Sequence, residues 1–185
     1  MIDCGVAYKR VEPYLSCVKT LLITHNHSDH VKPSTLSLIK KEWPGITTFG
    51  NWEVAQSFNN VDYICNAGFP VFTQDNICIE PFECKHNTTC TGYTWEDPEL
   101  GRTIYATDTQ TFDNAPDGLY DTFLIESNHD ETKLRLAKHS GKYGYNAYAG
   151  GMRHASTQQA KAFYYTRRTS KKALFIEMHK SKRFY

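Results

Sequence analysis

The sequence predicts a layered α/β sandwich. Strand-like segments with alternating apolar and polar residues fill the middle of the chain, segments with helix signals lie at both ends of the order, and Gly, Pro and Asn separate them. The chain has 185 residues, which is enough to bury a full core, and its sequence contains no repeat, low-complexity tract or obvious linker. We therefore expect one domain over residues 1–185.

The first third of the chain predicts two strands and two helices. Residues 1–4 look like the end of a strand, and the β-branched, leucine-rich residues 17–24 predict a buried strand. A helix is expected over residues 33–41, because Pro suits the first helical position and a Trp-Pro-Gly sequence ends the segment. A second short helix fits residues 52–58.

The remaining two thirds alternate between strands and helices. Runs rich in β-branched and aromatic residues predict strands over residues 62–65, 77–86, 91–95, 103–107 and 120–126. A helix is expected over residues 131–138. Another begins at Ser156, whose hydroxyl can cap the first turn while Gln159 reaches back in a capping box. Residues 172–178 predict the last strand.

The composition favours a cytoplasmic protein. No apolar run approaches the length needed to cross a bilayer, and Asp3 interrupts the N-terminus where a signal peptide would need apolar residues. Six cysteines without a C-x-x-C pair predict reduced thiols, with a disulfide or zinc-ribbon framework as the alternative.

The net charge of +1 conceals an asymmetry along the chain. Residues 58–131 contain fourteen acidic side chains against two basic ones, whereas the last 25 residues contain eight basic side chains against one acidic. The basic tail could attract phosphate groups, and a solvated helix face with a terminal tail is the alternative.

The segment after the first buried strand, residues 24–30, is the most informative of the chain; we call it the His loop. Its sequence Thr-His-Asn-His-Ser-Asp-His brings together His25, His27, Asp29 and His30. Imidazole and carboxylate groups are the usual protein ligands of Zn²⁺ and similar divalent ions. A loop at the end of a core strand is also where a rigid scaffold holds functional side chains. The sequence therefore predicts a metal site, and an ordinary solvated loop is the alternative.

Three later residues repeat the order of a strand followed by a metal-ligand side chain. His86 follows residues 82–85, Asp108 follows residues 103–107, and His154 follows a glycine turn and precedes the capped helix. Each alone is more often a satisfied polar group, but together with the His loop they predict further ligands.

With these residues the chain resembles the metallo-β-lactamase fold superfamily of metal-dependent hydrolases. Asp3 looks like the family's first motif, where an aspartate braces the His loop, and residues 25–30 match the second motif at every metal-binding position. The resemblance implies a four-layer αββα sandwich with two divalent ions. It implies one ion on His25, His27 and His86, a second on Asp29, His30 and His154, and Asp108 as the bridge between them.

The resemblance is strongest to the nuclease and phosphodiesterase branch. Aspartate stands at the fourth motif, where classical lactamases have cysteine, and residues 123–130 and 153–160 look like the closing motifs of the YycJ-like group. That group is similar to tRNase Z-type nucleases and to the phage anti-Pycsar cyclic-nucleotide phosphodiesterases. The expected substrates are cyclic nucleotides or short nucleic acids, and a phage counter-defence role is compatible with them.

Two departures from the family pattern affect these expectations. The chain begins almost on the first motif, whereas family members usually carry about thirty more residues before it. The fold is therefore expected to be shortened at its N-terminus, with one edge of the first sheet absent, supplied by a partner chain, or missing from this sequence. An uncovered sheet edge invites pairing, which favours a homodimer. In addition, His86 is followed by Asn87 and not by the commoner aspartate.

For catalysis we expect metal-activated hydroxide to attack phosphorus, with Asp29, Asp108 and His129 as the candidate catalytic residues. Asp108 would hold the ions, and His129 would donate a proton to the leaving group or contact the phosphate; a solvent-facing residue at a helix start is the alternative for His129. The candidate substrate contacts are Asn128, His129, Arg153 and Ser156, although Ser156 also caps its helix and Arg153 also suits a salt bridge. Five aromatic residues are candidates for stacking a base, or else belong to the core: Tyr93, Trp95, Tyr143, Tyr145 and Tyr148.

The metal and the scissile bond are less closely defined by the sequence. Zinc is expected from the His-rich donor set, with Mn²⁺ or Fe²⁺ as alternatives. A lactonase, thioesterase or lactamase is the alternative among hydrolases, and a degenerate domain that binds a nucleotide without turnover is the alternative outside enzymes.

Overall fold

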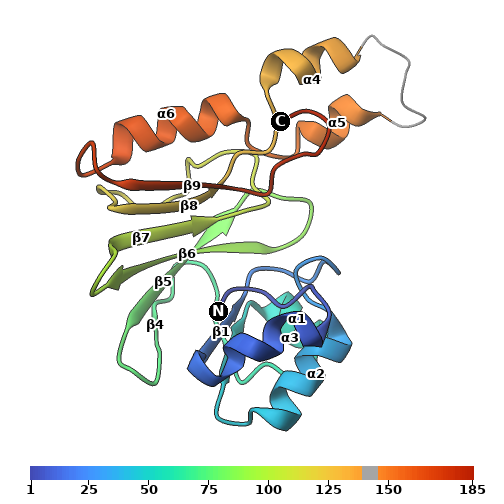
Figure 1. The fold of residues 1–185 in the computed structure, drawn as a ribbon, viewed down its shortest axis with the longest axis vertical. Helices are drawn as coiled ribbons and strands as arrows, with labels where there is room; N and C mark the ends of the chain where they lie inside the picture. The colour runs from blue at the N-terminus through green and yellow to red at the C-terminus, as the bar shows by residue number, and fades with distance from the viewer. Residues whose placement is uncertain (139–145) are drawn as a thin grey trace. The chain divides into compact units, whose positions relative to one another are not determined.

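The computed structural model describes residues 1–138 and 146–185, which divide into two compact units (Figure 1). Unit 1 comprises Met1–Pro81 and Thr88–Thr91, and unit 2 comprises Phe82–Asn87 and the described residues of Gly92–Tyr185. The expectation of one domain over residues 1–185 stays a prediction.

Unit 1 contains a parallel sheet of order β1-β2-β3, formed by Thr20–Ile23, Thr47–Gly50 and Tyr63–Ile64. Parallel neighbours need crossover connections, and helices supply them: α2 (Pro33–Glu42) joins β1 to β2, and α3 (Trp52–Ser57) joins β2 to β3. Before β1 the chain forms α1 (Tyr8–Val11) and a 3₁₀ helix, η1 (Glu12–Cys17).

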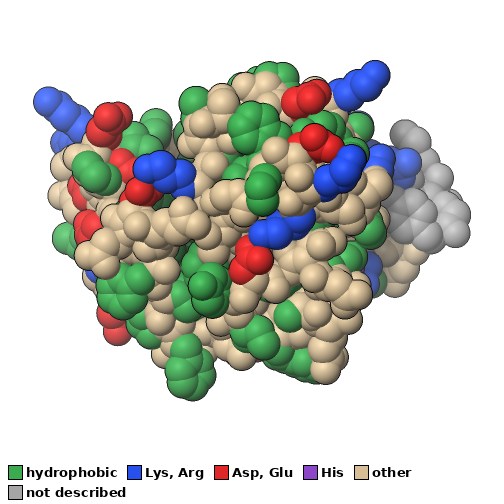
Figure 2. All heavy atoms as spheres, turned by 90° about the horizontal axis from the view of Figure 1, so that it is seen from below, with side chains coloured by type: hydrophobic (Ala, Val, Ile, Leu, Met, Phe, Trp, Pro, Cys, Tyr) green, Lys and Arg blue, Asp and Glu red, His purple; other side chains and the backbone are tan. Residues whose placement is uncertain are grey.

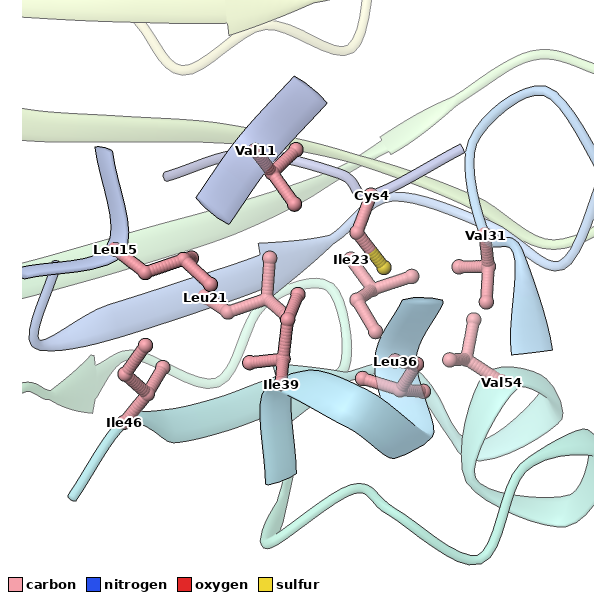
Figure 3. Packing of buried hydrophobic residues seen from close by; sticks show 10 residues of the cluster. All are labelled: Cys4, Val11, Leu15, Leu21, Ile23, Val31, Leu36, Ile39, Ile46 and Val54. Atoms are coloured by element: carbon pink, nitrogen blue, oxygen red, sulfur yellow. The ribbon is translucent and has the colours of Figure 1, made fainter. Parts of the chain in front are cut away.

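The core of unit 1 lies between β1 and its helices (Figure 3). Leu21 and Ile23 alternate on one face of β1, while Leu36 and Ile39 are three residues apart on one face of α2, and all four are fully buried. This packing fixes the end of β1, and with it the start of the His loop.

Unit 2 contains most of a second sheet, whose hydrogen-bonded order is β4-β5-β6-β7-β8-β9. Its strands are Val71–Phe72, Cys78–Cys84, Cys90–Asp97, Gly101–Ala106, Thr122–Glu126 and Leu174–Met178; β4 and the first residues of β5 and β6 belong to unit 1. Strands β7, β8 and β9 are parallel. The carboxyl ends of these three strands therefore lie at the same end of the sheet. In open α/β sheets, ligands bind at the carboxyl ends of the strands.

The helices of unit 2 are α4 (Glu131–Lys138), α5 (Ala147–Gly151) and α6 (Thr157–Arg167). Helix α6 begins with the predicted capping box between Ser156 and Gln159. Aromatic rings pack α6 against the sheet. Tyr164 stacks on Phe175 of β9 with 4.8 Å between ring centroids, and it meets Phe123 of β8 edge-on with 5.2 Å between centroids.

The predicted helices, and the strands predicted after residue 16, are confirmed with shifted ends. Residues 1–4, which were expected to end a strand, form isolated bridges, Ile2 with Leu22 and Cys4 with Val31. Cys17 belongs to η1, so the first strand begins only at Thr20. The short elements α1, β2, β4 and α5 were not expected from the sequence. No disulfide joins the six cysteines, all of which are described, so the thiols are reduced as predicted, although Cys17 is exposed.

The surface is mixed in character. On the face in Figure 2, hydrophobic side chains lie among acidic and basic ones. Among the described residues no helix combines the length and the apolar character needed to cross a membrane.

Candidate functional site

In unit 1 the three imidazoles of the His loop lie against one another. The ring centroids of His25 and His27 are 4.6 Å apart, and those of His25 and His30 are 4.2 Å apart. His25 is fully buried and its Nδ1 contacts the Thr24 hydroxyl at 3.0 Å, whereas Asp29 is 68% exposed. The loop therefore presents two buried donor residues, His25 and His30, and two more accessible ones, His27 and Asp29, at the end of β1.

Asp3 braces the His loop from the N-terminal segment. Its carboxylate accepts hydrogen bonds from the Thr24 backbone N–H at 2.8 Å and the Thr24 hydroxyl at 3.0 Å, and lies 2.7 Å from Nδ1 of His30. Since an ionised carboxylate only accepts, His30 donates from Nδ1, which orients Nε2 as metal-binding histidines require. The backbone of Asp3 has a φ of 59°, a left-handed value that is uncommon outside glycine.

Glu53 holds the same loop from α3. Its carboxylate accepts hydrogen bonds from Asn26 at 2.9 Å, from the Thr88 hydroxyl at 2.7 Å and from the Thr89 backbone N–H at 3.0 Å. The hydrogen bonds from Thr89 and Thr88 lower the pKa of Glu53 to about 2. Glu53 thus fixes Asn26, which stands between His25 and His27, although sequence analysis gave it no role.

In unit 2 three imidazoles surround one buried carboxylate. Asp108 follows β7 and is 3% exposed; its carboxylate oxygens lie 3.6 Å from His86 Nε2, 3.7 Å from His154 Nδ1 and 3.8 Å from His179 Nε2. These separations exceed normal hydrogen bonds. They are near the roughly 3.4 Å that separates two ligand atoms on a tetrahedral zinc ion with bonds of about 2.1 Å. The donors therefore have the chemistry and the spacing of a metal site.

Glu126, the last residue of β8, orients two of these imidazoles. Its fully buried carboxylate lies 2.8 Å from His154 Nδ1 and 2.7 Å from His179 Nδ1, and it accepts a 2.8 Å hydrogen bond from the Thr109 backbone N–H. Burial acts to raise the pKa of Glu126, but the hydrogen bonds from His154 and His179 outweigh it, so the pKa is lowered. Carboxylates that hold the far nitrogen of a histidine in this way are characteristic of metal sites.

His179 is a candidate ligand that sequence analysis missed. It follows β9 directly, so the signal was the same order of strand and ligand that identified His86 and Asp108. It lies within 4.8 Å of Asp108, Glu126 and His154, as part of one group of donors able to hold a metal. Asp108 and His179 both have positive φ angles, 54° and 51°. Such strained residues cluster at functional sites.

The expected substrate contacts lie in different surroundings. Asn128 donates to the backbone carbonyl of His179 at 2.8 Å, and Ser156 caps α6 while donating to Glu131 at 2.7 Å, so both make structural contacts. Arg153 is exposed. His129 is 3% exposed and its Nδ1 has no hydrogen-bond partner among the described residues; burial lowers its pKa.

A cavity of about 280 Å³ adjoins this part of unit 2. Its lining includes Gln110, His129, Glu131, Tyr148, Met152 and His154. Of the candidate stacking residues, Tyr148 lines this cavity, Tyr93 is fully buried in the core and Trp95 is half-buried on β6. Tyr143 and Tyr145 lie outside the described residues.

Comparison with known proteins identifies the fold. The chain matches no protein-family profile and no curated protein sequence. The solved structures that resemble it include the metallo-β-lactamase fold protein YhfI from Bacillus subtilis (TM-score 0.58, 14% identity), human tRNase Z, short form (0.66, 15%), and a diphosphatase from the PhnP family (0.61, 14%). They cover 86, 98 and 99% of this chain, which in turn covers 66, 81 and 68% of theirs. The chain therefore has the metallo-β-lactamase fold, as predicted.

Proposed function

We propose that the chain is a metal-dependent hydrolase of phosphodiester bonds, acting on cyclic nucleotides or short nucleic acids. The observation that carries the proposal is the buried Asp108 carboxylate with three imidazole nitrogens 3.6–3.8 Å away, two of them on histidines oriented by Glu126. Imidazole nitrogens and carboxylate oxygens at this spacing are the donor groups that Zn²⁺ and similar divalent ions bind in proteins.

The ligand assignment rests on the sequence resemblance, with one change that the geometry of unit 2 supports. His179 has Nδ1 on Glu126 and Nε2 facing Asp108, the usual arrangement of a metal-binding histidine. His154 has the same atom, Nδ1, near both Glu126 and Asp108, which turns its Nε2 away from both carboxylates. We therefore propose His179 for the ligand position first given to His154. The residues that would hold the ions are then His25, His27, Asp29 and His30 of the His loop, as the resemblance implies, with His86, Asp108 and His179 of unit 2.

When bound, two divalent ions supply a hydroxide nucleophile near neutral pH and stabilise the charge that develops on the phosphoryl oxygens. The chain's own residues then position the reaction. Glu126 fixes the His154 ring, and His154, which lines the cavity, can give a proton to the leaving oxygen. His129 lines the same cavity and contacts the substrate in this scheme.

The choice of a phosphodiester is supported by the aspartate at the fourth motif. Two of the structural neighbours are a tRNase and a diphosphatase by name. Zinc remains the proposed metal because of the His-rich donor set, with Mn²⁺ and Fe²⁺ as the other ions to test.

Substrate panels test the proposal directly. The purified chain, loaded with zinc or manganese, should hydrolyse members of a panel of cyclic mononucleotides, cyclic dinucleotides and short RNAs, and should contain about two metal equivalents by emission spectroscopy. Hydrolysis of lactones, thioesters or lactams alone would contradict the proposed bond. Activity that is insensitive to salt would indicate a small substrate, because a polymer that contacts many phosphates loses affinity steeply with salt.

Two single substitutions separate the roles of the neighbouring histidines. His179→Ala should lose metal together with activity, whereas His154→Gln should keep metal and lose turnover. The opposite pattern would return His154 to the ligand set and exclude its role as the proton donor.

We also propose that the chain forms a homodimer. The exposed apolar residues Tyr63, Ile64 and Phe72 belong to β3 and β4, which are the edge strands of their sheets. Exposed edges of this kind favour pairing with another chain. Light scattering on the wild type and on Phe72→Lys tests this, since a monomeric wild type would contradict the proposal.

A further inference from the structure

The cavity of unit 2 has the size of a site for one small group. Its volume of about 280 Å³ is just below the range of roughly 300–1,000 Å³ that is typical of small-molecule sites. Because His154 belongs both to its wall and to the donor group around Asp108, the cavity adjoins the proposed reaction centre. The group that it holds would therefore be attached close to the scissile phosphate.

One part of the cavity wall suits a flat ring. Tyr148 is half-buried and packs against the apolar cluster of Leu134, Ala147 and Phe184. The Lys138 ammonium lies 4.8 Å from the centroid of its ring, so the ring is held in place. Leu134 and the half-exposed Met152 add apolar surface to the same wall. Aromatic side chains stack with any nucleobase, because every base has a π-face.

The polar part of the wall has a cationic residue, the exposed Arg135, and an acidic one, Glu131, and the part next to Glu131 suits the edge of a base. Glu131 accepts a hydrogen bond from Ser156 and retains further acceptor capacity, since a carboxylate has about four lone-pair sites. Its negative charge opposes an anion and favours a hydrogen-bond donor such as an amino group. His129 also lines the cavity, and its buried Nδ1 has no hydrogen-bond partner among the described residues. Buried polar atoms of this kind are normally satisfied, and a ligand in the cavity can supply the missing hydrogen bond.

We infer that this cavity binds the nucleobase of the substrate, with the base stacked on Tyr148 and its polar edge bonded to Glu131 and His129. The inference rests on the proposed function, because it assigns part of a nucleotide substrate to a pocket beside the same centre. It predicts a preference for bases that carry an amino group (guanine, adenine and cytosine) over uracil. It also predicts that a sugar phosphate without a base binds poorly.

Calorimetric titration with nucleoside monophosphates, which contain no phosphodiester bond, tests the inference without the proposed turnover. The full chain is titrated with the 5′-monophosphates of guanosine, adenosine, cytidine and uridine, and with ribose 5-phosphate as the ligand without a base. The amino-bearing nucleotides should bind at least about tenfold more tightly than ribose 5-phosphate, given the usual strength of base stacking.

Matched variants separate the contributions of the side chains. Tyr148→Leu should weaken nucleotide binding about fivefold or more, while Tyr148→Phe keeps the stacking ring and the affinity. Glu131→Gln should reduce the preference for amino-bearing bases over uracil. Glu99→Gln, the same chemical change at an exposed residue of unit 2 outside the cavity, should leave binding unchanged.

The outcomes distinguish the two proposals. Equal binding of ribose 5-phosphate and the nucleotides, or unchanged binding by Tyr148→Leu, would overturn the base site. Hydrolysis of bis(4-nitrophenyl) phosphate by the metal-loaded chain would still support the proposed function in that case. Base-selective binding without hydrolysis of any diester would overturn the proposed function and retain the base site.

Discussion

Replacing Glu126 with glutamine should weaken metal binding as well as the fold. The variant amide can still accept the hydrogen bond from the Thr109 backbone N–H. It can no longer act as a charged acceptor for Nδ1 of His154 and of His179, which lie 2.8 and 2.7 Å from the Glu126 carboxylate in the wild type. Each hydrogen bond to a charged group contributes about 1.5–3 kcal/mol. The loss of two therefore lowers the free energy of unfolding by about 3–6 kcal/mol, which agrees with the roughly 3–5 kcal/mol that removing one partner of a buried charged pair costs.

Calorimetry with and without metal measures both effects. For a chain of this length, the expected loss of stability lowers Tm by roughly 10 °C. Because the carboxylate also orients the two imidazoles, metal affinity measured by competition with a chelator should fall about 10- to 100-fold.

Asp121→Asn is the matched control for this variant. Asp121 accepts hydrogen bonds from the Arg102 backbone N–H at 3.0 Å and from the Thr169 hydroxyl at 2.5 Å, next to the other end of β8. This control should lower Tm without changing metal affinity. If Glu126→Gln behaves like the control and binds metal as tightly as the wild type, the proposed orienting role of Glu126 is refuted.

Three further predictions concern unit 1. His27→Ala should abolish metal-dependent activity while leaving the far-ultraviolet circular dichroism spectrum near normal, and full activity in the purified variant would count against the site. The pKa of Glu53 is lowered from 4.5 to about 2, so its ionised form should stabilise the fold above pH 4.5. We expect a contribution of about 2 kcal/mol, which is less than the pKa shift alone would give because solvent screens a partly exposed carboxylate. This contribution is lost as the pH falls from 4.5 towards 2, so the difference in stability between wild type and Glu53→Gln should shrink over that range; a difference independent of pH would contradict it. Gly5→Ala would place a Cβ 1.7 Å from the backbone oxygen of Asp29, so unfolding measurements should show a loss of about 3 kcal/mol or more; near-normal stability would refute this.

The parts of the fold that were predictable are those with a strong local signal. Helix α2 follows from Pro33 and an apolar spacing of three residues, and α6 from the Ser156 capping box. Strand β2 and helix α5 gave little signal. The four residues of β2 are too few for a clear alternation, and the five of α5 end in two glycines that disfavour a helix on their own. These elements form because the rest of the fold packs against them.

For the candidate site, local sequence revealed donor types but not how the strands bring them together. The His loop is a single segment, so its composition was sufficient to identify it. The grouping of Asp108, Glu126 and His179 depends on the parallel pairing of β7, β8 and β9. This pairing joins residues about twenty positions apart (β7 with β8) and about fifty positions apart (β8 with β9), and no local pattern encodes it. Glu53 and Glu126 were missed as supporting residues for the same reason, because their partners are distant in sequence.

The left-handed backbone at Asp3, Asp108 and His179 has a consequence for protein engineering. Each such conformation typically costs about 1–3 kcal/mol in a residue with a side chain, and glycine would relieve that cost. A search for heat-tolerant variants that rewards stability alone would therefore be drawn to these positions, and would remove the very carboxylates and imidazole on which the proposed chemistry depends. Selection for heat resistance in this chain should be coupled to a screen for metal retention.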